Sequence, residues 1–128
     1  MTGPVAANPV RTVEAARLPA EIAAAEAEGF TVRRIDCADA EGMMGDLAHA
    51  LHWQRNLGFL PQGLNLDALY DALHHEPNDL RPRLMLVFTG MAALATRDPG
   101  RAITLPRVIA DRAAEVAARG WRLSALMA

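Results

Sequence analysis

The chain has 128 residues, of which 52% are hydrophobic and 22% charged, and its formal net charge is −2. These values indicate one globular domain, and no apolar run approaches the ~20 residues that a membrane-spanning helix needs. The first residues show neither a basic region nor a continuous apolar run, so no secretory signal is predicted. Cys37 is the single cysteine. It excludes an internal disulfide, favours a reducing cytoplasm, and is expected to be a buried, inert thiol.

Charge is distributed unevenly along the chain. All 13 basic residues other than histidine are arginine. The net charge is 0 over residues 1–34, −7 over residues 35–80 and +5 over residues 81–128. An acidic middle section favours a basic partner over nucleic acid. The alternative is that the acidic and basic sections complement each other within one fold, and the sequence leaves both interpretations open.

Taken in chain order, the hydrophobic pattern predicts a tail and lead-in over residues 1–18, then a single domain over residues 19–128. Residues 10–13 could form a short extended piece. The predicted elements are a helix at 19–29, a strand at 30–35, helices at 43–53 and 65–75, a strand at 84–88, a short helix at 91–96, a turn at 98–100, a helix at 104–119 capped by Thr104, and a strand at 121–127. The run LMLVF at 84–88 is typical of a strand covered on both faces. Strands separated by helices predict an α/β fold with a small parallel three-stranded sheet and helices packed around it.

The predicted helix 65–75 carries the most informative pattern. Leu66, Leu69 and Leu73 share one face, which is expected to be the buried one. The outward face offers two carboxylates, an aromatic ring and an imidazole, from Asp67, Asp71, Tyr70 and His74. Paired carboxylates accept several charge-assisted hydrogen bonds from guanidinium or ammonium groups, and the ring adds apolar contact. A solvated helix face is the alternative interpretation.

The string NLDALYDAL at residues 65–73 resembles the helix motif of the barstar family, the intracellular inhibitors of secreted ribonucleases. The resemblance covers roughly residues 30–128. It implies a protein-binding inhibitor without catalytic activity or cofactor, whose target is a ribonuclease or toxin with a basic cleft. By match to the motif, Asp67 and Asp71 would occupy the place of substrate phosphate in the target's active site. Tyr70 stands where the family has a tryptophan and would pack beside them.

The loop before this helix departs from the family pattern. The resemblance implies that Gly63 lets the loop turn tightly, but Pro61 and Gln62 stand where the family usually has aromatic residues. Phe59 is the obvious substitute for the missing aromatic contact. Alternatively, residues 54–58 are an insertion in the binding loop. The expected partner-binding residues are therefore Phe59, Gln62, Gly63, Asp67, Tyr70, Asp71 and His74.

Two other function classes fit less well. One is an interaction or immunity module of the same fold that binds a protein other than a nuclease. The other is an enzyme that uses the histidines to hold a metal, but His49 and His52 lack a clear third ligand and no HExxH motif is present. The C-terminal arginines are spread out without interleaved aromatic residues, a pattern that does not favour nucleic-acid binding. The sequence therefore predicts a cytoplasmic bacterial antitoxin or immunity protein with no metal, nucleic-acid or membrane partner.

Overall fold

The computed structural model describes residues 9–50 and 83–128, and its centre is a four-stranded parallel sheet of order β1-β4-β3-β2. The strands are β1 (Val10–Thr12), β2 (Thr31–Asp36), β3 (Arg83–Thr89) and β4 (Arg122–Met127). The helices are α1 (Leu18–Ala27), α2 (Ala40–Ala50), α5 (Met91–Arg97) and α6 (Pro99–Ala117), with a single 3-10 turn, η1 (Ala15–Arg17), ahead of α1. The predicted α/β class with a parallel sheet is confirmed. The predicted number of three strands is wrong, because β1 pairs with β4 and adds a fourth.

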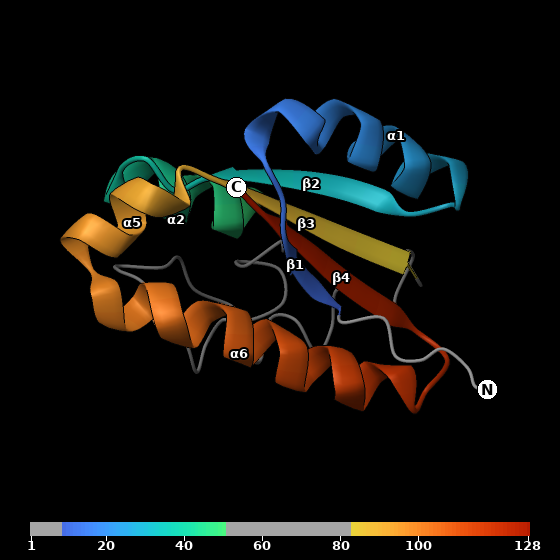
Figure 1. Ribbon diagram of the computed structural model, residues 1–128. Helices are drawn as coiled ribbons and strands as arrows, with labels where there is room; N and C mark the ends of the chain where they lie inside the picture. The colour runs from blue at the N-terminus through green and yellow to red at the C-terminus, as the bar shows by residue number, and fades with distance from the viewer. Residues whose placement is uncertain (1–8, 51–82) are drawn as a thin grey trace.

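The central strand β3 divides the core into two clusters. Its residues 84–88 are all buried, and successive side chains of a strand point to opposite faces. Leu84, Leu86 and Phe88 pack with residues of α2, α5 and α6, whereas Met85 and Val87 pack with residues of α1. Figure 1 shows α1 over one face of the sheet and α6 along the other. The prediction that LMLVF is covered on both faces is confirmed.

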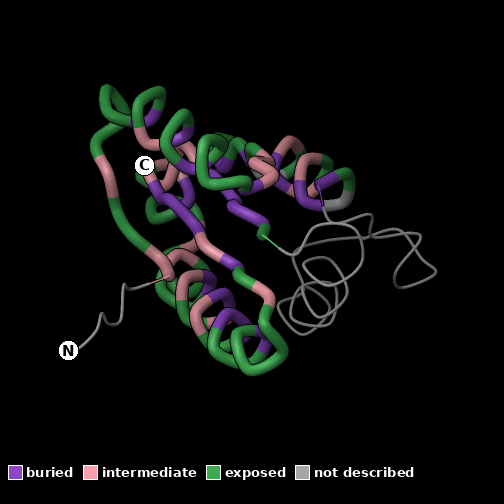
Figure 2. The backbone as a smooth tube through the Cα atoms, turned by 90° about the vertical axis from the view of Figure 1, so that its right-hand side faces the viewer, coloured by how far each residue is buried: buried purple, intermediate pink, exposed green. Residues whose placement is uncertain are grey.

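Each helix buries one stripe of its surface against the sheet. Residues three, four or seven positions apart lie on the same side of a helix, which explains the spacing of the buried positions. Figure 2 shows this arrangement as buried strands between helices whose outer turns are exposed. The buried residues are Leu18, Ile22 and Ala25 of α1, Met43, Leu47 and Ala50 of α2, Leu94 of α5, and Leu105, Ile109, Arg112, Ala113 and Val116 of α6.

The long helix α6 begins earlier than its sequence pattern predicts. The predicted turn at 98–100 is instead the helix start, because the Asp98 carboxylate accepts a hydrogen bond from the backbone N–H of Arg101 at 3.2 Å. Proline is favoured in the first helical turn, where its missing N–H is not needed, so Pro99 fits as the first residue. The hydroxyl of Thr104 donates to the carbonyl of Gly100 at 2.8 Å and does not cap the helix.

The N-terminal part of the chain is bound to the sheet from Pro9 onward. The N–H of Ala125 donates to the carbonyl of Pro9 at 2.7 Å, and the N–H of Val13 donates to the carbonyl of Met127 at 2.9 Å. The predicted extended piece near residues 10–13 is confirmed as β1. The proposed division into a lead-in over residues 1–18 and a domain over residues 19–128 stays a prediction.

Candidate functional site

The expected partner-binding residues lie between α2 and β3, in residues 51–82, which are outside the described residues. They are Phe59, Gln62, Gly63, Asp67, Tyr70, Asp71 and His74. The described structure shows the two points from which this section extends. Ala50 at the end of α2 is 3% exposed and Leu84 near the start of β3 is 0% exposed, and both belong to the same core cluster. Both described residues that flank this part of the chain are therefore buried in the core.

Three acids of the acidic middle section hold the connection between β2 and α2. A carboxylate oxygen of Asp36 accepts from the N–H of Ala38 at 2.9 Å, and one of Asp39 accepts from the N–H of Gly42 at 2.7 Å. Asp46 accepts from the N–H of Asp36 at 2.9 Å. Asp39 thereby satisfies one of the unpaired donors at the start of α2. Glu41 makes no such contact among the described residues. The other four acids of the section lie outside them: Asp67, Asp71, Glu76 and Asp79.

The four ion pairs that lie wholly within residues 9–50 and 83–128 connect residues close in sequence. They are Arg11–Glu21 at 2.9 Å, Arg17–Glu21 at 3.8 Å, Arg101–Asp98 at 2.9 Å and Arg112–Glu115 at 2.7 Å. The hydrogen bond from Arg11, and then its charge, lower the pKa of Glu21. None of these four pairs joins the acidic middle section to the basic C-terminal section.

Cys37 is a buried, neutral thiol. Its side chain is 0% exposed, and burial raises its pKa to about 11, although the charge of Arg97 acts in the opposite direction. A thiolate is the nucleophilic form of cysteine, so this environment disfavours reactivity. The predicted burial of Cys37 is confirmed.

The histidines that the enzymatic alternative requires fall mostly outside the described residues. His49 is exposed on α2, and the others are His52, His74 and His75. Among the described residues, no three His, Cys, Asp or Glu side chains gather where they could hold a metal ion. A groove of about 530 Å³ lies between α6, β4 and the start of β1, and its lining includes Arg11, Trp121 and Arg122 but no histidine. No described helix has the length and apolar character to cross a membrane.

One polar contact near α2 has no counterpart in the sequence predictions. Arg97, in the last turn of α5, donates to the carbonyls of Cys37 at 2.7 Å and Ala38 at 3.1 Å. These groups are about sixty residues apart in the chain, and no spacing or motif links them. The available signal is a basic residue directly after a short predicted helix, and such a residue is too common to identify this contact.

The fold and the contacts around α2 define a small α/β domain with a parallel sheet, in which the expected contact residues lie in the sequence between α2 and β3. A family model described as Barstar (barnase inhibitor) matches residues 28–128, and the chain belongs to this family. The resemblance seen in NLDALYDAL is thereby confirmed. No curated protein and no solved structure matches the chain.

Proposed function

We propose that this protein is a non-catalytic inhibitor that blocks the basic active site of a ribonuclease or ribonuclease-like toxin. The observation that carries this proposal is membership of the family described as barnase inhibitor, over residues 28–128. The part of the chain that would enter the target lies between α2 and β3. Its cytoplasmic location, as an antitoxin or immunity protein, belongs to the same proposal and is supported by the single reduced cysteine.

The physical basis of inhibition is electrostatic complementarity. A ribonuclease active site arranges basic side chains around the phosphate of its substrate, and carboxylates of Asp67 and Asp71 would satisfy those same donors. Charge of opposite sign accelerates the encounter of two proteins, and charge-assisted hydrogen bonds then slow their separation. Tyr70 and Phe59 would supply apolar contact, because buried aromatic anchors contribute most to tight interfaces.

The first experiment is a titration of the purified protein against a panel of small ribonucleases that begins with barnase. Asp71→Ala is expected to raise Kd by roughly 30-fold or more, the effect of losing one interface hot spot worth about 2 kcal/mol. Glu14→Ala is the matched control, because Glu14 is an exposed acid ahead of η1 and far in sequence from the motif. Equal losses of affinity in the two variants would reject residues 65–75 as the contact.

The sequence of the loop before the motif favours a second candidate function for the same fold. Pro61 and Gln62 replace aromatic residues that the family resemblance leads one to expect, so the target surface need not be that of barnase. The alternative function is an immunity module for a protein that is not a nuclease. A specific partner without ribonuclease activity, isolated with the wild-type protein but not with Asp71→Ala, would favour this alternative.

A further inference from the structure

The loop Cys37–Asp39, which joins β2 to α2, has almost every backbone polar group occupied. The N–H of Cys37 donates to the carbonyl of Thr89 at 2.7 Å, and the N–H of Ala38 donates to Asp36. The carbonyl of Asp39 accepts from the N–H of Met43 at 3.1 Å, which opens the hydrogen-bond ladder of α2. The carbonyls of Cys37 and Ala38 both accept from Arg97. The position of this loop therefore fixes where α2 begins.

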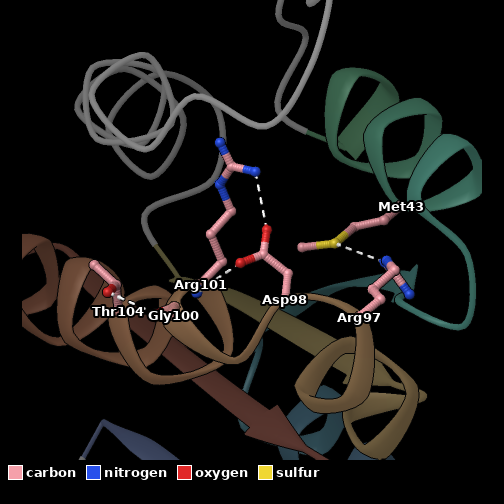
Figure 3. A network of polar contacts seen from close by, with 6 residues as sticks. All are labelled: Met43, Arg97, Asp98, Gly100, Arg101 and Thr104. Carbon is pink, nitrogen blue, oxygen red and sulfur yellow. Dashed lines mark hydrogen bonds and ion pairs between the residues drawn. The ribbon is translucent and has the colours of Figure 1, made fainter.

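The short helix α5 contacts this loop from both of its ends. At its start, Gly90 has φ +72°, and a Cβ atom on Gly90 would lie 2.7 Å from the backbone nitrogen of Ala38. At its end, Arg97 reaches the two loop carbonyls, and its other terminal nitrogen lies 3.9 Å from the sulfur of Met43 inside α2 (Figure 3). One guanidinium thus connects α5 to the loop and to the first turns of α2.

The contact is part-buried at the carbonyl of Cys37, a residue that is 0% exposed, and exposed at the carbonyl of Ala38. A buried carbonyl that loses its donor remains unsatisfied, since water does not reach it easily. One terminal nitrogen of Arg97 donates to both carbonyls and the other lies near the sulfur of Met43, whereas an ammonium group carries its three N–H donors on a single nitrogen and cannot occupy both places. No other described residue is seen donating to these two carbonyls. The loop therefore depends on Arg97 in a way that lysine reproduces only in part.

We propose that Arg97 is a positioning residue for partner binding, an inference that rests on the proposed function. It holds the start of α2 (Ala40–Ala50), and the expected contact residues follow α2 in the chain. A correctly placed α2 fixes the point from which those residues follow, and a fixed starting point lowers the ordering cost of binding. Loss of Arg97 therefore raises the dissociation rate of the complex and leaves the association rate nearly unchanged.

The test measures binding kinetics of the full chain with a ribonuclease that the wild-type protein binds. Arg97→Met is expected to raise koff at least tenfold and to change kon less than twofold, and Arg97→Lys is expected to fall between Arg97→Met and wild type. Arg101→Met is the matched control, because it removes the same charge from the neighbouring helix and breaks only the exposed pair with Asp98. Asp71→Ala, in contrast, is expected to lower kon at low salt.

A second measurement, made on the free protein, separates failure of the Arg97 proposal from failure of the proposed function. Amide hydrogen exchange of α2, from Met43 to Ala50, is expected to accelerate at least tenfold in Arg97→Met relative to Arg101→Met, while β3 stays protected. Equal koff values for these two variants, or unchanged exchange in α2, would overturn the proposal. If wild-type protein inhibits none of the ribonucleases, the proposed function fails and the binding role of Arg97 fails with it. Exchange in α2 then still decides whether Arg97 holds the helix.

Discussion

The two faces of the sheet are covered by different parts of the chain. One face packs against α2, α5 and α6, which all lie within the family match at residues 28–128. The other face packs against α1, which lies before that match, and its cluster includes Leu18, Ile22 and Ala25 from the helix. β1 also precedes the match and pairs with β4 at the sheet edge. Residues 9–27 thus form an N-terminal extension that adds one strand to the sheet and one helix to its second face.

We expect the folding unit to begin before the family match, because the helix that covers one sheet face precedes residue 28. Met85, Val87 and Leu126 belong to β3 and β4 of the matched part, and they are buried by the extension. Phe30, also in this cluster, would lose the apolar neighbours that α1 contributes. An exposed apolar patch of this kind promotes aggregation or binding to another protein. The extension therefore covers an apolar surface of the matched residues that would otherwise face solvent.

The largest expected effect comes from deleting residues 1–27. Burial of Leu18 and Ile22 alone contributes about 1.5–3 kcal/mol each, against a total stability of about 5–15 kcal/mol for a typical domain. The exposed sheet face adds to this loss. We expect the truncated protein to lose its cooperative thermal transition in circular dichroism and to aggregate in size-exclusion chromatography.

The control for this experiment is deletion of residues 1–8, which retains β1, η1 and α1. We expect this shorter deletion to melt close to the wild-type temperature. A protein of residues 28–128 that melts at the same temperature as the full chain would show that the matched part folds alone. The comparison between the two faces would then be wrong.

A smaller effect is expected from truncating one side chain in each cluster. Phe88→Ala, on the face covered by three helices, is expected to cost about 3–5 kcal/mol, and Ile22→Ala about 2–5 kcal/mol. We expect Phe88→Ala to cost more, because Phe88 is 0% exposed and Ile22 is 6% exposed at the surface of the single covering helix. Urea denaturation measures both free energies of unfolding. Arg107→Ala, an exposed change on α6, is the control and is expected to stay within about 0.5 kcal/mol of wild type.

Equal losses for Phe88→Ala and Ile22→Ala would mean that the two faces contribute alike. A larger loss for Ile22→Ala would reverse the comparison and make the extension the main source of stability. In either case the exposed control shows whether the difference comes from burial and not from substitution as such.

Much of the fold could be predicted because its signals are local. The helix at 18–27, the strands β2 and β4, and the fully apolar β3 all follow from spacing and residue type within a few positions. The pairing of β1 with β4 could not be predicted, because Val10 lies opposite Ala125 and nothing in either segment specifies the other. The start of α6 was missed because Asp98-Pro99-Gly100 reads equally well as a turn and as a capped helix start.

The candidate site likewise has one part that the sequence predicts and one contact that it does not. The motif at residues 65–73 is a local signal, and it was sufficient to identify the family. The contact of Arg97 with Cys37 and Ala38 depends on the packing of α5 against the β2–α2 loop, so it became visible only in three dimensions. The roles of Asp67, Asp71 and their neighbours stay predictions that binding experiments must test.

The smallest expected effect concerns the ion pair that joins β1 to α1. Arg11 lowers the pKa of Glu21, so the ionised carboxylate is favoured in the folded state. A lowered carboxyl pKa adds stability above its ordinary value of 4.5, and this contribution is lost as the pH falls through that value toward the lower folded pKa. Glu21→Gln should therefore weaken the fall in stability on acidification, measured by urea denaturation above pH 4.5 and at a series of pH values below it.

The effect of Glu21→Gln should also shrink as salt is added, because exposed charges are screened. Glu26→Gln, an exposed acid on the same helix, is the matched control and should keep the wild-type pH dependence. The same pH slope in Glu21→Gln and Glu26→Gln would show that the Arg11 pair does not stabilise the extension. A flatter slope for Glu21→Gln alone would show that charge, as well as the apolar contacts of Leu18 and Ile22, holds α1 and β1 together on the second face of the sheet.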